Sequence, residues 1–143
     1  MMFSDFAMGG AGPDLKSLAP EYLARIKHHF EPYKSFIRPV LSSALVYHHA
    51  FGLPNTKPGD WIALEHATPG RSRGYRGIFR LAGAKKDQYF FRPCELDSSK
   101  TYKVTFDDAE GSFRLNGFEL QRDTIDVRIG QPLRSKLLLF EAQ

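Results

Sequence analysis

The sequence contains one cysteine, Cys94, and no long apolar run. A single cysteine excludes an internal disulfide and any metal site built from cysteines, and we expect Cys94 to be a small, semi-buried core residue. Apolar stretches such as residues 137–140 are far shorter than the roughly 20 residues that cross a membrane. We therefore expect no membrane partner. Residues 1–12 carry no basic segment of the kind that begins a signal peptide, and a cytoplasmic location follows as the expectation.

The chain has little excess charge of either sign, since 20 Lys and Arg residues face 16 Asp and Glu residues and the net charge is +4. Such a balance permits a nucleic-acid partner without requiring one. Arg73-Gly74-Tyr75 matches the first three positions of an RNA-binding signature, but Arg76 stands where that signature needs glycine or alanine. The later sequence also lacks the helices that such a domain requires. We expect no nucleic-acid partner and interpret these arginines as a rim, solvated or paired with acids across a sheet.

What the second half of the chain does contain is a series of short β-type runs separated by turn residues, without a helical period. Residues 101–107 and 124–129 alternate apolar and polar side chains, as half-buried antiparallel strands do. The seven runs are residues 61–67, 75–83, 88–93, 101–107, 112–116, 124–129 and 136–142. A chain of 143 residues can close one principal core. The sequence therefore predicts a mainly β fold, an antiparallel β-sandwich.

Residues 18–40 have a different pattern. Their apolar positions recur at spacings of three and four, which predicts an amphipathic helix. The apolar stripe consists of Leu23, Ile26, Phe30, Tyr33 and Ile37. Pro32 lacks the backbone N–H that the middle of a helix needs, so we expect a kink or break there, and Pro39 should end the element. Residues 52–60, rich in proline and glycine, are the best candidate boundary between this helical part and the sandwich.

The helix follows a short strand-like segment, residues 1–6, and a glycine-rich loop. A lone strand–loop–helix unit cannot bury its strand, and its helix has one apolar stripe without a partner. Either the stripe folds onto the sandwich or two chains meet through it, because an exposed apolar patch of that size marks an interface. We favour a homo-oligomer formed through the face from Leu23 to Ile37.

A set of short motifs, spread over the last three quarters of the chain, resembles the C-terminal end of the melibiase-type α-galactosidases, glycoside hydrolase family thirty-six. The motifs are Tyr33-Lys34, Arg38-Pro39, Tyr47-His48-His49, Trp61, Leu64-Glu65, Phe79-Arg80-Leu81, Phe91-Arg92-Pro93, Leu96-Asp97, Tyr102-Lys103-Val104-Thr105-Phe106-Asp107, Gly117 and the run from Leu133 to Glu141. The resemblance implies that residues 1–45 are a remnant of a (β/α)₈ barrel. It implies that residues 46–143 are the antiparallel β-sandwich domain that packs behind the barrel.

The resemblance implies a retaining glycosidase whose two catalytic carboxyl groups lie on barrel strands upstream of this sequence. We therefore expect no catalytic residue and no cofactor in this chain. Asp5 lies at the end of the segment that resembles the last barrel strand, which makes it a candidate substrate-rim residue. Among the other loop carboxylates, Asp14, Asp107, Asp108 and Glu110, no pair is expected to converge on one bond, because adjacent strand residues diverge.

Exposed aromatic planes are the other candidate feature, because sugar rings stack on them. Trp61, Tyr75, Tyr89 and Phe90 are the aromatics to consider, although a sandwich core needs most of its large side chains. Trp61, just after the proline-rich loop, is the best candidate for a substrate-binding role. Carbohydrate is thus the candidate ligand, and the alternative to an enzyme scaffold is a free-standing carbohydrate-binding or protein-interaction module.

The histidines do not predict a metal site. His48 and His49 are neighbours on an extended segment and point to opposite faces, and His28 and His29 diverge on a helix. A composite site of His48, His49 and His66 lacks the ligand spacing of a known zinc site. We expect these histidines to be solvated or packed in the core.

Overall fold

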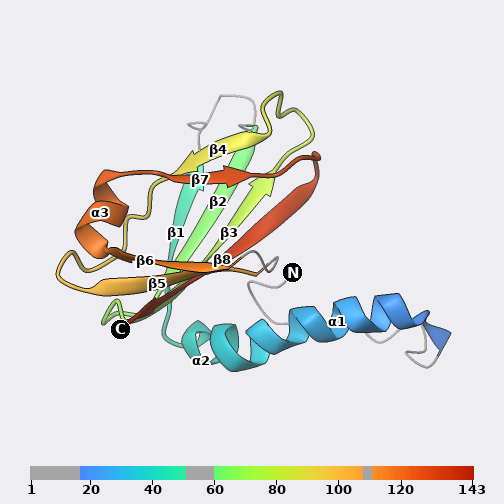
Figure 1. Cartoon of the computed structure of the whole chain (residues 1–143), viewed down its shortest axis with the longest axis horizontal. Helices are drawn as coiled ribbons and strands as arrows, with labels where there is room; N and C mark the ends of the chain where they lie inside the picture. The colour runs from blue at the N-terminus through green and yellow to red at the C-terminus, as the bar shows by residue number, and fades with distance from the viewer. Residues whose placement is uncertain (1–16, 51–59, 108–110) are drawn as a thin grey trace. The chain divides into compact units, whose positions relative to one another are not determined.

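The computed structural model describes residues 17–50, 60–107 and 111–143 of the chain (Figure 1). The chain divides into two compact units, residues 1–42 and residues 43–143. The first unit is helical in its described part and the second is built mainly from β-strands. Each is described by itself. The segment 1–6, which resembles a barrel strand, and the predicted boundary at 52–59 lie outside the described residues.

The first unit contains the predicted amphipathic helix, with an unexpected turn in its middle. The α-helix α1 spans Pro20–Pro32, the π-helical turn η2 spans Tyr33–Ile37 and the α-helix α2 spans Arg38–Leu41. Pro32 is the last residue of α1, and the following turn is widened so that Arg38 N–H donates to the carbonyl of Tyr33. The hydroxyl of Ser35 donates to the carbonyl of Glu31 at 2.6 Å. Pro32 therefore changes the helical register instead of breaking the helix.

The expectation that Pro39 ends the helix was wrong, because the helix runs on to Leu41. Pro39 is the second residue of α2 and follows directly on the π-helical turn. Within the stripe, Ile37 is buried and Leu23, Ile26 and Phe30 are half-buried. Self-association through this face stays a prediction.

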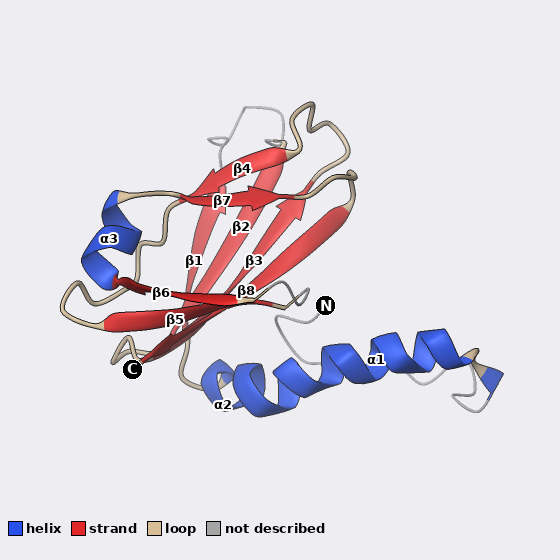
Figure 2. Cartoon of the chain, viewed as in Figure 1, coloured by secondary structure: helices blue, strands red, loops and turns tan. Residues whose placement is uncertain are grey.

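The second unit contains a six-stranded sheet and a two-stranded sheet, and its described strand pairs are all antiparallel (Figure 2). The large sheet has the order β1-β2-β3-β8-β5-β6, and the small sheet pairs β4 with β7. The strands are β1 Leu45–Ala50, β2 Trp61–Ala67, β3 Arg73–Arg80, β4 Gln88–Phe91, β5 Thr101–Phe106, β6 Ser112–Asn116, β7 Ile125–Arg128 and β8 Arg134–Ala142. All seven predicted runs contain a strand, and the predicted mainly β, antiparallel fold class is confirmed.

The core lies between the two sheets. One face of the large sheet supplies Ala63, Ile78, Val104, Leu138 and Phe140, and the small sheet supplies the apolar side chains of Phe91, Ile125 and Val127. The alternation of residues along each strand places every second side chain of β2, β3, β5 and β8 on this core-facing side. The period-two pattern of the sequence was therefore a correct guide to the buried face.

Two elements were not predicted as such, β1 and the short helix α3, Gly117–Arg122. Helix α3 begins with a capping box, since Phe118 N–H donates to Asn116 Oδ1 at 2.8 Å and Asn116 N–H donates to Glu119 Oε2 at 3.0 Å. The Asn-x-x-Glu spacing in the sequence is the pattern that could have predicted the start of this helix. Gly117 is required by packing, because a Cβ there would lie 2.1 Å from the carbonyl oxygen of Asp97.

Candidate functional site

The buried charges of the second unit form the most distinctive polar cluster in the described part of the chain. Glu65 on β2 and Arg76 on β3 are paired in the register of the two strands, and both are fully buried. Arg76 donates to Glu65 Oε1 from Nε at 3.0 Å and also from Nη2. The guanidinium lies over the ring of Phe140, 4.0 Å from its centroid. Gly74 provides the space, because a Cβ there would come within 2.5 Å of Arg76 Nη1.

Other groups complete the coordination of the Glu65 carboxylate. The backbone N–H of Cys94 donates to Oε2 at 3.1 Å, the N–H of Glu95 donates to Oε1 at 3.2 Å, and His49 Nε2 lies 2.7 Å from Oε2. Burial by itself raises the pKa of Glu65. The hydrogen bond with His49, the charge of Arg76 and the Cys94 N–H outweigh burial and lower this pKa from 4.5 to about 2. Glu65 is therefore ionised at neutral pH, and the His49 nitrogen that faces it donates the hydrogen bond.

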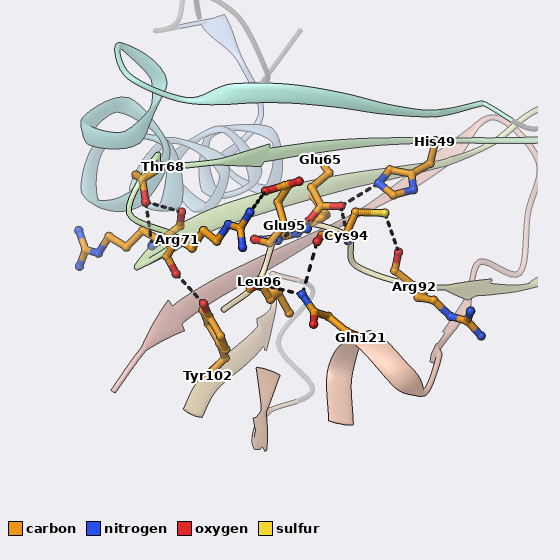
Figure 3. A network of polar contacts seen from close by, with 12 residues as sticks. His49, Glu65, Thr68, Arg71, Arg92, Cys94, Glu95, Leu96, Tyr102 and Gln121 are labelled. Atoms are coloured by element: carbon orange, nitrogen blue, oxygen red, sulfur yellow. Dashed lines mark hydrogen bonds and ion pairs between the residues drawn. The ribbon is translucent and has the colours of Figure 1, made fainter. Parts of the chain in front are cut away.

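The loop after β4 is held over this cluster by further polar contacts (Figure 3). Arg71 Nη2 lies 3.1 Å from Glu95 Oε2, and Tyr102 Oη donates to the carbonyl of Arg71 at 2.6 Å. Gln121 of α3 donates to the carbonyl of Leu96 at 2.7 Å. These contacts join β2, β3, β5 and α3 to one loop, so the cluster fixes the position of residues 94–97.

The cluster has the chemistry of a structural site and lacks the features of a nucleophilic one. The Glu65 carboxylate is balanced by Arg76 and has a lowered pKa, so it is too weakly basic to act as a general base at neutral pH. Partial burial and the charges of Glu65 and Glu95 raise the pKa of the Cys94 thiol, which disfavours a free, nucleophilic thiolate. The side chain of Cys94 is nonetheless exposed, which contradicts the expectation of a small core residue.

The arginines of β3 correct part of the sequence interpretation. Arg73 pairs with Glu141 of β8, and Arg76 pairs with Glu65, so pairing across the sheet is observed. Arg76 and Arg80 are not part of a solvated rim, however, because Arg76 is fully buried and Arg80 is 7% exposed. Arg80 donates to the carbonyls of Ile129 at 2.8 Å and Ala84 at 3.0 Å, which ties the loops at one end of the sandwich together.

The predicted substrate-binding residues are not brought together in the described part of the chain. Asp5 lies outside the described residues, as do Asp14, Asp108 and Glu110. Trp61 is 8% exposed and stacks on Tyr89, with ring centroids 5.4 Å apart. Sugar binding by Trp61 therefore stays a prediction, and it requires the Trp61 ring to separate from the Tyr89 ring. Tyr75 is buried and stacks on His66, whereas Phe90 is 58% exposed and is the aromatic of the predicted four that faces solvent most.

The strand register also decides the histidine arrangement. Val46 pairs with His66, and His48 lies two residues after Val46, so His48 and His66 share the outer face of the large sheet. His49 lies on the core-facing side with Glu65. The composite site of His48, His49 and His66 therefore cannot form. Instead, the described residues place His49, Glu65 and Cys94 together, a combination that no local sequence pattern indicates.

Solved structures contain a region with the same fold. No family model matches the chain, and no curated protein matches it by sequence. The α-galactosidase AgaA of Geobacillus stearothermophilus, a GH36 enzyme solved in complex with raffinose, aligns with 91% of this chain at a TM-score of 0.69 and 21% sequence identity. The fold is that of part of a GH36 α-galactosidase. This confirms, at the level of the fold, the resemblance that the sequence motifs carry.

Two other structures agree. The α-galactosidase of Lactobacillus brevis aligns with 91% of the chain at a TM-score of 0.67 and 17% identity. The galactosidase domain of the α-galactosidase–sucrose kinase AgaSK aligns with 90% at a TM-score of 0.69 and 14% identity. The chain spans only 17% of the length of AgaA and 18% of that of the Lactobacillus enzyme. In the described part of the chain, none of the helices is long and apolar enough to span a membrane.

Proposed function

We propose that this chain is the C-terminal region of an α-galactosidase-like glycoside hydrolase and that it serves as a non-catalytic scaffold. The observation that carries the proposal is the alignment of 91% of the chain, both helical segment and sandwich included, with a GH36 α-galactosidase at a TM-score of 0.69. A free-standing module would need only the sandwich. The cytosol remains the proposed location, and carbohydrate remains the proposed ligand of the complete enzyme.

The acidic groups of the described residues support a structural role. A retaining glycosidase needs two carboxyl groups about 5 Å apart and free to act on one bond. Most of the acidic side chains here are instead engaged in ion pairs, caps or turns. The partners are His49 and Arg76 for Glu65, Arg71 for Glu95, Ser99 and Lys100 for Asp97, the α3 N-terminus for Glu119, Arg122 for Asp123, Gln88 for Asp126 and Arg73 for Glu141.

The outer face of the large sheet supports the scaffold role in a second way. By the strand register this face carries the apolar side chains of Val46, Ile62, Leu64, Phe79 and Leu139. Val46 is 49% exposed and the other four are half-buried, whereas Tyr75 and Leu137 on the same face are buried. In the proposal, the rest of the enzyme packs on the part of this face that is exposed, since an apolar face of a sheet is normally covered by another layer.

The first prediction is that the purified chain does not hydrolyse α-galactosides. The expected rate of release from a nitrophenyl α-galactoside, at high protein concentration, equals that of a mock purification, because the carboxyl pair of the parent enzyme is absent. The Geobacillus enzyme serves as the positive control. Turnover above the mock value contradicts the proposal, and its loss in Asp5→Asn would assign that turnover to this chain.

A further inference from the structure

Three side chains with metal-binding atoms converge on the core-facing side of the large sheet. They are His49 of β1, Glu65 of β2 and Cys94 of the loop after β4. Their ligand atoms all lie within 4.8 Å of one another. Figure 3 shows the His49 ring and the Cys94 side chain next to each other beside the Glu65 carboxylate. The convergence follows from the register, since Tyr47 pairs with Glu65 and His49 is the next residue on the same face.

The three donors have the chemistry of one class of cation. Imidazole nitrogen, thiolate sulfur and carboxylate oxygen are the ligands that Zn²⁺ takes in proteins, whereas Mg²⁺ and Ca²⁺ take oxygen alone. Three protein ligands and one solvent ligand make a four-coordinate site. Glu65 is fully buried, the His49 side chain is 15% exposed and Cys94 is exposed. Solvent therefore has access to the cluster from the Cys94 side.

The surrounding contacts orient the carboxylate for such a cation. Arg76 and the Glu95 N–H bind Oε1, whereas Oε2 accepts from the backbone N–H of Cys94 and faces His49 Nε2. The His49 ring is held by an edge contact with Phe91, at a centroid distance of 5.2 Å. The 2.7 Å between His49 Nε2 and Oε2 is a hydrogen bond. If a cation replaces the proton shared by His49 Nε2 and Glu65 Oε2, these two atoms must move to about 3.3 Å apart. That is the distance between two ligand atoms of a tetrahedral site with bonds of about 2.0 Å.

We propose that His49 Nε2, Glu65 Oε2 and Cys94 Sγ form a binding site for Zn²⁺ or a cation of similar preference, with water as the fourth ligand. The site departs from the sequence-based expectation of no metal, because its ligands are separated by 15 and 28 residues and only the sheet brings them together. The positive charge of Arg76 beside Oε1 lowers the affinity for a cation. The negative charges of the carboxylate and of the thiol that the bound cation deprotonates offset this effect. The sulfur and imidazole donors favour a divalent ion of borderline softness over a hard one.

Titration of the metal-free full chain with Co²⁺ and Zn²⁺ tests the proposal. Co²⁺ should produce the thiolate-to-cobalt charge-transfer band and the intense visible bands of tetrahedral cobalt, and Zn²⁺ should abolish both. Cys94→Ser should remove the charge-transfer band. His49→Gln keeps a hydrogen-bond donor for Glu65 but lacks the imidazole, and it should weaken Zn²⁺ binding at least about tenfold in calorimetry.

His48→Ala is the matched control, because His48 is adjacent in sequence but lies on the opposite face of the sheet. It should bind both metals as the unaltered chain does. Circular dichroism of each variant establishes that the fold is retained, and His49→Gln and Cys94→Ser are both conservative enough to allow that comparison. The proposal is overturned if the unaltered chain binds neither metal, or if either variant binds Zn²⁺ as tightly as the His48→Ala chain.

Discussion

Replacing Arg76 with methionine should lower the free energy of unfolding by about 3–5 kcal/mol, out of the roughly 5–15 kcal/mol that a domain of this kind possesses. The substitution leaves the Glu65 carboxylate fully buried without its cation. It also removes the guanidinium that lies over Phe140. Urea denaturation followed by the fluorescence of Trp61, the single tryptophan of the chain, measures the loss.

Two control variants distinguish the loss of the buried ion pair from the general effect of replacing an arginine on the free energy of unfolding. Arg73→Met, on the same strand, breaks an ion pair whose side chains are 41% and 37% exposed, and should cost at most about 1 kcal/mol. Adding Glu65→Gln to Arg76→Met removes the uncompensated charge while keeping one acceptor oxygen, which can serve one of the two N–H groups, of Cys94 and Glu95, that bind the carboxylate. The double variant should recover at least half of the loss. An Arg76→Met variant as stable as Arg73→Met would show that the pair has no such role.

The second unit should lose stability in acid through Glu65. The pKa of this group is about 2 in the folded chain and near its ordinary value of 4.5 in the unfolded chain. The unfolded chain therefore binds the proton first as the pH falls. The stabilisation is complete above pH 4.5 and is lost between pH 4.5 and 2, with a difference of about 3 kcal/mol.

Urea denaturation at a series of pH values in metal-free buffer measures this dependence. The Glu65→Gln/Arg76→Met chain is the control, since it keeps the other carboxyl groups of the protein and lacks the one at position 65. Subtracting its pH dependence from that of the unaltered chain isolates the contribution of Glu65. The subtraction also removes the contribution of Asp97, whose pKa is lowered to about 2 by its contacts with Ser99. Parallel curves for the two chains would contradict the prediction.

The features predictable from the sequence are those that depend on neighbours along the chain. The alternation of Tyr102, Val104 and Phe106 identified β5 and its buried face, because a strand repeats every two residues. The spacing of three and four residues between apolar positions around Ile26, which predicted the helix, likewise depends only on neighbours along the chain. Pro32 was judged correctly as a disturbance, but its outcome, a π-helical turn between two α-helices, depends on how the following residues rebuild their hydrogen bonds.

The candidate site could not be predicted in the same way, because it is a product of strand order and register. Glu65 and Arg76 are opposite only because β2 pairs with β3 in one particular register. A one-residue shift would place either side chain on the other face. His49 joins them through the pairing of β1 with β2, and Cys94 through a loop that closes over the sheet. The motif Leu64-Glu65 belonged to the family resemblance, yet nothing in the sequence alone indicated that its carboxylate is buried and paired.

A sugar titration tests most directly whether the sandwich is a scaffold or a carbohydrate-binding module. Galactose and raffinose are added to the isotope-labelled full chain in the millimolar range while backbone amide shifts are followed by NMR. The scaffold account predicts no saturable shift. Trp61 is buried in its stack on Tyr89 and presents little open ring surface, and Phe90 is the one ring of the four candidate aromatics that is largely exposed. A saturable shift that disappears in Phe90→Ala or Trp61→Ala would contradict it.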